Sequence, residues 1–333
     1  MSYDAILLLS FGGPEKREDV IPFLENVLRG RNVPRERMLE VAEHYYHFGG
    51  RSPINGYCRE LLAAMRASLP LPVYWGNRNW HPLLAETMRQ MARDGVRRAL
   101  ALATSAYAGY SGCRQYLENI ETARREVGED APVVDKIPPF CAHPLFVQAN
   151  AERVREAMER IAEAGRPAAR VVYTAHSIPV AMAAASEYEG QIRATALAVS
   201  ARLGIAAWDV AWQSRSGPPA QPWLEPDILT HLRALAVQGV EDVLIAPIGF
   251  LSDHMEVLYD LDVEAADLCS GLGLRMTRAG TAGLHPTLLR MIGELVREGM
   301  AAPEPPACAD VCCPPPLRPQ AARPAGSGAL SRA

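Results

Sequence analysis

The strongest constraint on the fold is an alternation of short apolar runs with amphipathic helical patterns, repeated between residues 5 and 300. Such alternation is typical of a parallel β-sheet covered by helices on both faces. The apolar runs are nearly continuous, as strands buried on both sides require. We therefore expect an α/β fold with about eight strands in two parallel sheets of four. The runs that predict strands are 5–11, 72–78, 98–107, 170–177, 208–214, 242–253 and 274–283.

The chain has 333 residues, enough for two domains at roughly 100–200 residues each. A long helical pattern at 143–165 is expected to open the second half. From Pro303 the composition changes to Pro, Ala, Gly and Arg, which cannot pack a core. Residues 303–333 are therefore expected to form a cysteine-containing tail.

Charge and composition exclude several classes of protein. The net charge is −4, whereas a nucleic-acid binder usually shows a basic face, so no nucleic-acid partner is expected. No apolar run approaches the ~20 residues of a membrane span, so no integral membrane association is expected. The N-terminus is too short and too acidic for a signal peptide. These features predict a cytoplasmic protein. The glycines at 12–13 do not form the fingerprint of a dinucleotide site.

A histidine stands where one strand-like run stops. Residues 171–175 predict a buried strand, His176 follows them, and Pro179 breaks the pattern shortly afterwards. Ligands of open parallel sheets bind just outside the carboxyl ends of the strands. His176 is therefore either a working group or a turn residue with a hydrogen bond, and one histidine alone does not separate these alternatives.

Acidic residues follow another strand-like run. Glu256, Asp260 and Glu264 are spaced by four, which on a helix makes one acidic stripe. One interpretation is a solvated helix face with no role. The other is a path for a divalent cation, because carboxylates and imidazoles are its ligands. The position directly after a strand favours the cation path.

Three of the seven cysteines, Cys308, Cys312 and Cys313, lie close together in the tail. They are either incidental thiols or metal ligands, since clustered thiols in a cytoplasmic chain more often bind metal than form disulfides. Soft thiolates select zinc or an iron–sulfur cluster. Four thiolates complete either site, so one more must come from the folded body. Cys58 and Cys269 lie in helical patterns and are interpreted as packing residues.

Six motifs together resemble the ferrochelatases, which insert ferrous iron into a porphyrin. They fall in family order between residues 3 and 300. The resemblance implies two Rossmann-like domains, 1–140 plus 281–302 and 141–280, that face each other across a porphyrin cleft. The motifs are "LLLSFGGPE", "FGGRSPING", "GNRNWHP", "TAHSIP", "WQSRSGPPAQPWLEPD" and "GFLSDHMEVLYDLD".

The segments "LENVLRGR" and "GYSGCRQY" look most similar to the actinobacterial branch of the family. That branch is associated with coproporphyrin III as substrate and coproheme as product. The resemblance therefore implies insertion of Fe(II) into coproporphyrin III in heme biosynthesis. The alternatives are a protoporphyrin IX ferrochelatase that forms protoheme, and a non-catalytic tetrapyrrole or metal carrier on the same fold. Transient contacts with neighbouring heme-pathway enzymes are expected.

The resemblance also assigns roles to individual residues. His176 matches the family's active-site histidine and Glu256 its partner carboxylate, and either can contact the substrate iron. Asp260 and Glu264 match an acidic line that leads from the site toward the surface. The residues that match the porphyrin-binding positions are Ser52 and Tyr116, at the propionates, and Arg29 and Arg31, at the lip of the cleft.

The expected chemistry explains the histidine at the strand end. A porphyrin loses two N–H protons as the metal enters, so it needs a base beside the ring. An imidazole with a pKa near 6.5 takes protons at neutral pH, and a nearby carboxylate passes them on or holds the metal. The sequence leaves open whether His176 takes protons or delivers iron.

One position departs from the family pattern. Some bacterial relatives have a tyrosine in the first motif that reaches toward the inserted metal, and here that position is Phe11. Phenylalanine cannot ligate iron. If a side chain holds the iron from that face, His44 and Tyr45 are the candidates.

The resemblance gives the tail thiols a role as well. Some ferrochelatases carry a 2Fe-2S cluster on a C-terminal extension, with one ligand from the body of the protein. Cys141 is the expected fourth ligand beside Cys308, Cys312 and Cys313, because it lies in a Pro-bounded loop near the predicted domain junction. Cys113 is the alternative.

Overall fold

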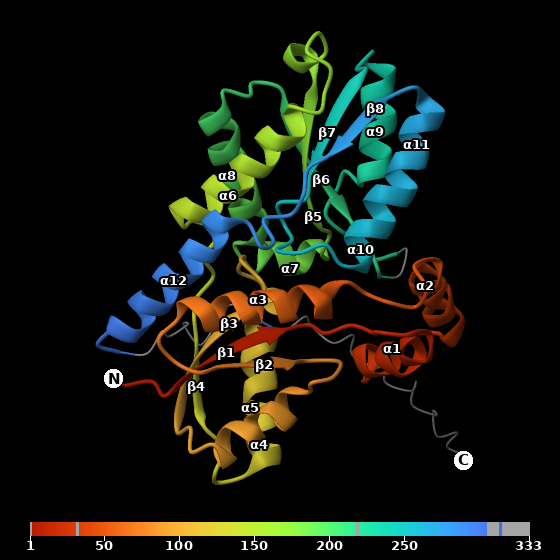
Figure 1. Ribbon diagram of the computed structural model, residues 1–333. Helices are drawn as coiled ribbons and strands as arrows, with labels where there is room; N and C mark the ends of the chain where they lie inside the picture. Colours follow the sequence, from red (N-terminus) through yellow and green to blue (C-terminus); the bar gives the residue numbers. More distant parts are fainter. Residues whose placement is uncertain (1, 31–32, 218–219, 305–312, 315–333) are drawn as a thin grey trace, which may run out of the picture.

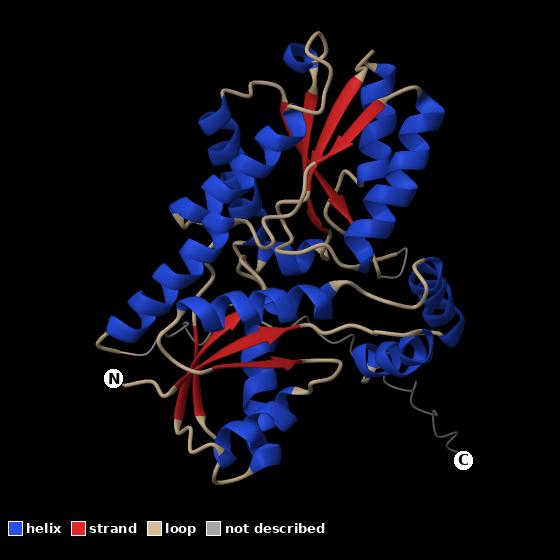
Figure 2. Cartoon of the chain, in the orientation of Figure 1, coloured by secondary structure: helices blue, strands red, loops and turns tan. Residues whose placement is uncertain are grey.

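Two parallel four-stranded sheets form the centre of the molecule (Figures 1 and 2). The computed structural model describes residues 2–30, 33–217, 220–304 and 313–314. The strand order is β2-β1-β3-β4 in the first sheet and β6-β5-β7-β8 in the second. The predicted α/β fold with two sheets of four is therefore confirmed. The strands are β1 (Ala5–Ser10), β2 (Val73–Asn77), β3 (Arg98–Ala103), β4 (Val133–Lys136), β5 (Arg170–His176), β6 (Trp208–Gln213), β7 (Asp242–Ala246) and β8 (Arg275–Arg278).

Helices cover both faces of each sheet (Figure 1). In the first half they are α1 (Val20–Leu28), α2 (Arg35–His47), α3 (Ile54–Ser68), α4 (Leu84–Arg93) and α5 (Gln115–Val127). In the second half they are α6 (Pro144–Met158), α7 (Val180–Ala184), α8 (Tyr188–Leu203), α9 (Ile228–Val237), α10 (Met255–Val257), α11 (Ala266–Leu272) and α12 (Pro286–Ala301). Short 3-10 segments η1 (Arg17–Asp19) and η3 (Arg166–Ala168) and π-helical segments η2 (Tyr110–Arg114) and η4 (Leu258–Ala265) complete the described elements.

The strands form where the sequence places continuous apolar side chains. All six residues of β1 are buried, and so are residues 171–175 of β5, which precede its final His176. β4 is a short edge strand with mixed exposure, which explains why its pattern was not singled out in the sequence. One hydrophobic cluster contains residues of both sheets, so the two halves share a continuous core.

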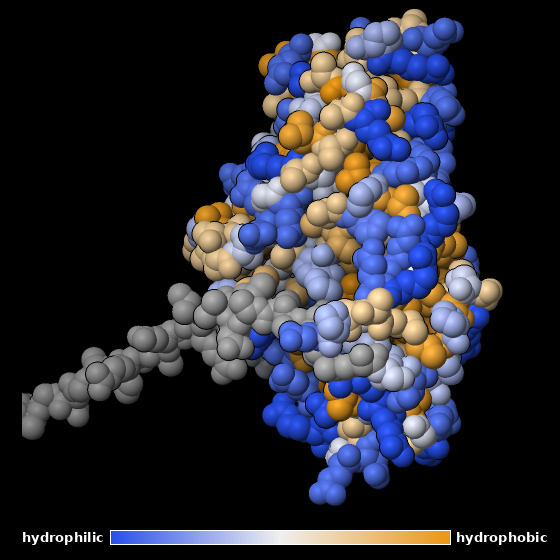
Figure 3. All heavy atoms as spheres, turned by 90° about the vertical axis from the view of Figure 1, so that its left-hand side faces the viewer, coloured by the Kyte–Doolittle hydropathy of each residue, from blue (hydrophilic) through white to orange (hydrophobic). Residues whose placement is uncertain are grey.

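The last helix lies beside both halves of the molecule. α12 packs on α6 and also on α3 and β3. Its buried residues, among them Leu288, Met291 and Val296, face inward. On the side of the molecule that carries α6, α8 and α12, hydrophilic and hydrophobic residues are interspersed (Figure 3). The domain limits at 140/141 and 280/281 stay a prediction.

The topology determines where a site can form. In both sheets the chain starts in an inner strand and then adds strands on its two sides. The order therefore reverses between β1 and β3 and again between β5 and β7, and ligands of such sheets bind at the carboxyl ends beside this reversal. The loop after β7 crosses the end of β5 at Gly249, whose N–H donates to the Thr174 carbonyl at 3.0 Å. A Cβ at Gly249 would lie 2.4 Å from that of Ala175, so only glycine fits.

The helical segment after β7 is not one regular α-helix. Residues 255–272 form α10, then η4 with π-helical geometry, then α11. A π-helix bonds each N–H one residue further back than an α-helix does, and such segments often lie at functional sites. Within the described residues, no helix is both long and apolar enough to cross a membrane.

Candidate active site

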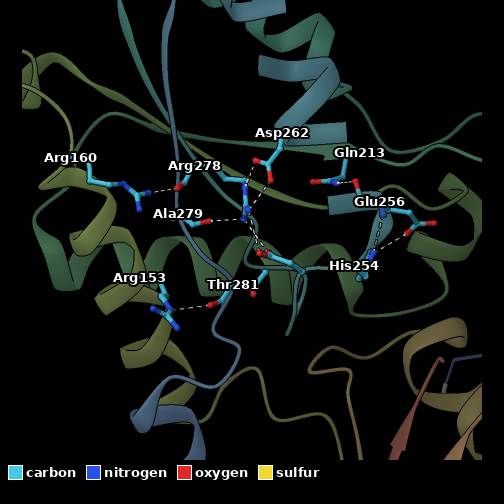
Figure 4. A network of polar contacts seen from close by, with 10 residues as sticks. Arg153, Arg160, Gln213, His254, Glu256, Asp262, Arg278, Ala279 and Thr281 are labelled. Atoms are coloured by element: carbon cyan, nitrogen blue, oxygen red, sulfur yellow. Dashed lines mark hydrogen bonds and ion pairs between the residues drawn. The ribbon is translucent and has the colours of Figure 1, made fainter. Parts of the chain in front are cut away.

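Polar side chains gather at the carboxyl ends of the second sheet. His176 ends β5. Gln213 ends β6 and Arg278 ends β8, while the loop after β7 leads to His254 and Glu256 (Figure 4). The strands are parallel and adjacent, so these ends meet at one edge of the sheet. The segments "TAHS" and "SDHME" therefore place His176 and Glu256 close together, as their predicted joint action requires.

His176 faces Glu256 with one specific nitrogen. Its Nε2 lies 3.7 Å from Oε2 of Glu256. Its Nδ1 contacts the carbonyl oxygen of Ser177. A carbonyl can only accept, so Nδ1 carries the hydrogen and neutral His176 keeps a lone pair on Nε2. The Tyr188 hydroxyl donates to the His176 carbonyl at 2.9 Å, which ties this strand end to α8.

The pair is electrostatically coupled. Burial lowers the pKa of His176, but the Glu256 carboxylate outweighs burial, and the pKa is raised overall. Burial raises the pKa of Glu256, but the imidazoles of His176, His254 and His44 outweigh it and hold that pKa well below its usual range. The side chains of His176 and Glu256 are 30% and 48% exposed, so both can be reached from solvent. The carboxylate therefore favours the protonated form of His176 more than water would, and the imidazoles favour the charged form of Glu256.

His254 is a third member of the site, to which the sequence analysis assigned no role. Its Nδ1 accepts from the Glu256 backbone N–H at 3.2 Å and so caps α10. The same nitrogen lies 4.0 Å from the Glu256 carboxylate. Burial and the His176 charge lower its pKa, although Glu256 and Asp253 act in the other direction. His254 therefore positions the start of the helix as a neutral imidazole.

The acidic line continues from Glu256 along η4. Oδ2 of Asp260 accepts from the Ser214 hydroxyl and from Nε2 of Gln213, the latter at 3.3 Å. Gln213 also donates to the Glu256 carbonyl at 3.3 Å (Figure 4). Burial and the nearby carboxylates of Glu256 and Glu264 raise the pKa of Asp260 to about 7, although the Ser214 hydrogen bond opposes them. Glu264 is exposed, and burial and Asp227 raise its pKa.

Gln213 and Ser214 are site residues that the sequence analysis missed. Both stand at the end of β6 or directly after it, so the same strand-end rule that selected His176 selects them. Ser214 has a φ of +63°, a backbone conformation that a non-glycine residue seldom adopts and that clusters at functional sites.

The raised pKa of Asp260 predicts a pH dependence of stability. A carboxyl group whose pKa rises on folding stabilises the fold below its unfolded pKa of about 4, and this contribution is lost as pH rises through the folded pKa of about 7. Asp260→Asn should therefore melt several degrees above the parent at alkaline pH, with a gain that shrinks toward about pH 4. Thermal melts without added metal measure it. Asp267→Asn, an exposed carboxylate on α11, is the control, and a gain independent of pH would contradict the prediction.

The predicted propionate-binding residues belong to the first half. Ser52 is buried, and its Oγ accepts from the Ile54 N–H at 3.5 Å at the start of α3. Tyr116 is also buried, with the guanidinium of Arg78 4.7 Å from its ring centroid. Arg29 is exposed after α1 and donates to Asn26 at 2.6 Å. Arg31 lies outside the described residues.

The face around Phe11 contains the two candidates for an additional iron ligand. Phe11 packs edge-on against Phe23, and Tyr45 packs against the same ring. His44 stacks on Tyr259 of η4, with ring centroids 3.8 Å apart and planes at 9°. Burial and Arg37 lower the pKa of His44, and Glu256 acts in the other direction. The α2 helix thus contacts the helix that carries the acidic line.

Two of the four predicted cluster cysteines are described, and both are buried: Cys141 and Cys313. Cys308 and Cys312 lie outside the described residues. Cys141 occupies a turn before α6, where burial raises the pKa of its thiol to about 11. Among the described residues, no group of three or more His, Cys, Asp or Glu side chains is arranged to hold a metal ion.

Comparison with solved structures identifies the class of fold. The sirohydrochlorin-type chelatase "SirB from Bacillus subtilis with Fe3+" matches with a TM-score of 0.59 and 12% identity, covering 90% of this chain and 96% of that one. CbiX, described as the terminal enzyme for siroheme biosynthesis in denitrifying bacteria, matches with a TM-score of 0.51 and 15% identity, covering 88% and 98%. At such identities the likeness shows only the fold, which is that of α/β chelatases.

Sequence comparison identifies the family. The ferrochelatase family profile matches residues 3–300. A ferrochelatase of Rhodopirellula baltica is 54% identical, covering 89% of this chain and 86% of that protein. The coproporphyrin III ferrochelatase of Nocardia farcinica is 49% identical, covering 97% of this chain and 99% of that protein. The coproporphyrin III ferrochelatase of Mycolicibacterium smegmatis is also 49% identical, covering 90% of this chain and 90% of that protein. The chain belongs to the ferrochelatase family and is a ferrochelatase enzyme.

Proposed function

We propose that this ferrochelatase inserts Fe(II) into coproporphyrin III and forms coproheme in heme biosynthesis. The proposal is supported by relatives of that name at 49% identity over nearly the whole chain. The observation that carries the chemistry is the His176–Glu256 pair, in which the lone pair of Nε2 faces the carboxylate across 3.7 Å. A non-catalytic carrier would not need such a pair.

In the proposed reaction His176 is the base. Its Nε2 accepts a pyrrole proton, while Nδ1 keeps its hydrogen on the Ser177 carbonyl. The carboxylate of Glu256 stabilises the imidazolium that forms. Two protons leave the porphyrin as one Fe(II) enters, so His176 must pass on the first proton before it takes the second. Asp260, whose pKa is raised to about 7, receives these protons, and Glu256, Asp260 and Glu264 form the path by which iron reaches the ring.

The proposed porphyrin contacts come from the first half of the chain, whereas this pair belongs to the second. Ser52, Tyr116, Arg29 and Arg31 are proposed to bind propionates. Because Tyr116 stacks under Arg78, that guanidinium also lies near the proposed contacts. Coproporphyrin III has four propionates and protoporphyrin IX has two, so the former needs more polar partners.

This difference predicts substrate preference. Purified protein assayed with Fe(II) should turn over coproporphyrin III at least about tenfold more efficiently than protoporphyrin IX, since two lost charge-assisted contacts are worth about 1.5–3 kcal/mol each. Anaerobic assays of both porphyrins in parallel measure kcat/KM. Arg29→Gln should reduce the preference, with the exposed Arg35→Gln as the control. A preference for protoporphyrin IX would establish the alternative function, formation of protoheme.

We also propose that Cys141, Cys308, Cys312 and Cys313 hold a 2Fe-2S cluster. The support is the resemblance of the tail motif and the buried position of the two described thiols. When bound, the cluster supplies four metal–thiolate bonds that tie the tail to the body. Iron insertion moves no electrons, so no step of the reaction requires it. A cytoplasmic location and transient contacts with neighbouring heme-pathway enzymes stay predictions.

A further inference from the structure

Arg278, at the end of β8, binds two carboxylates with its whole guanidinium. Its Nε and one terminal nitrogen donate to Asp262 at 2.5 and 2.9 Å, and both terminal nitrogens donate to Asp253 at 3.1 and 3.3 Å (Figure 4). A terminal nitrogen also donates to the Ala279 carbonyl at 3.3 Å. Arginine has five N–H donors in a rigid plane, so these five bonds use all of them. The side chain is 16% exposed.

The two carboxylates bracket the segment that carries the acidic side of the site. Asp253 directly precedes His254, and Asp262 follows Asp260 by two residues. Between them the chain changes from a loop to α10 and then to π-helical η4. A change of helix type leaves the backbone without one regular hydrogen-bond ladder. A rigid group bound to both ends of the segment fixes the distance between them.

We propose that Arg278 is a positioning residue for iron insertion, which holds Glu256 and Asp260 at their places opposite His176. The inference rests on the proposed function of that site. The hydrogen bonds of Arg278 go to Asp253, Asp262 and Ala279, and its side chain lies apart from that of Glu256 in Figure 4. Its effect is therefore transmitted through Asp253 and Asp262.

The same strand provides a matched control. Arg275, at the other end of β8, donates to Asp242 at 2.8 and 2.6 Å and to Glu241 at 2.9 Å. It is also an arginine on two carboxylates, but its side chain is 60% exposed and neither carboxylate belongs to the acidic segment. A loss that is specific to Arg278 cannot then be ascribed to a missing arginine–carboxylate pair in general.

The test compares Arg278→Lys and Arg278→Gln with Arg275→Lys and Arg275→Gln. We measure kcat and KM for Fe(II), the porphyrin dissociation constant by fluorescence quenching, and the melting temperature. Lysine keeps the charge but is a point donor that cannot reproduce two bidentate contacts. We expect kcat to fall about tenfold in Arg278→Lys and about 100-fold in Arg278→Gln, since misplacement by about 1 Å can cost that much. Porphyrin affinity should stay within about twofold, because the proposed propionate contacts lie in the other half.

Two results would overturn the positioning role. One is a parental kcat in Arg278→Lys, and the other is an equal loss of kcat in the Arg275 variants at matched melting temperature. If Arg278→Gln does not fold, Asp253→Asn removes one of the two carboxylates that Arg278 binds and should lower kcat about tenfold. A parental kcat in Asp253→Asn would contradict the positioning role. Glu256→Gln is assayed in parallel as a test of the site itself. Parental turnover in Glu256→Gln would overturn the proposed function of the site, whereas the Arg278 variants test only the positioning role.

Discussion

His176→Ala should abolish iron insertion and leave porphyrin binding measurable. The variant removes the imidazole nitrogen that lies 3.7 Å from Glu256, and general-base catalysis of this kind contributes about 10²–10⁴-fold. The porphyrin is proposed to be held by its faces and propionates, so its affinity should change little. Anaerobic turnover with Fe(II) and fluorescence titration with the porphyrin measure the two quantities separately.

A second histidine of the same domain controls for folding. His231 of α9 lies 3.2 Å from Asp209 of β6 and is 14% exposed, so it is also a histidine–carboxylate pair. It faces the start of β6, away from the site-forming end at Gln213. His231→Ala should keep its turnover well below its melting temperature. If folded His176→Ala inserted iron at nearly the parental rate, the proposed role of His176 as the base would be refuted.

Much of the site could be predicted because strand ends are visible in a sequence. The apolar runs stop at His176 and before Asp253, and parallel strands bring such stops to one edge. The spacing of Glu256, Asp260 and Glu264 predicted one helical stripe. It could not predict the π-helix η4, because apolar periodicity over so few residues does not separate the two helix types. The stripe exists, but Asp260 is held by Gln213 and Ser214 from another strand.

Arg275 and Arg278 show why the rest could not be predicted. Both arginines lie in the same four-residue strand and both bind two carboxylates. Only the three-dimensional structure shows that one faces the acidic segment and the other faces solvent. The difference depends on which loops the tertiary fold brings to each end of β8, and local pattern carries no information about that.

Cys141→Ser should remove the proposed cluster from the protein as isolated without oxygen. The parent should contain about two iron and about two sulfide per chain, with visible absorption typical of a 2Fe-2S centre. Cys141 lies in the turn between β4 and α6, and its backbone N–H donates to the Ala106 carbonyl at 3.1 Å. Serine preserves that turn but removes the thiolate, so the absorption should be lost. The melting temperature should fall as well, because the binding energy of a site that is absent from the unfolded chain is folding energy.

Cys113→Ser is the discriminating control for this prediction. Cys113 is also buried, but it lies in η2 beside the start of α5, and its variant should keep both the absorption and the iron content. Loss of the cluster in Cys113→Ser with retention in Cys141→Ser would assign the fourth ligand to Cys113. A colourless, zinc-loaded or metal-free parent that is fully active would refute the cluster altogether. Because insertion moves no electrons, Cys141→Ser should retain turnover at temperatures below its own melting transition, and this separates a structural cluster from a catalytic one.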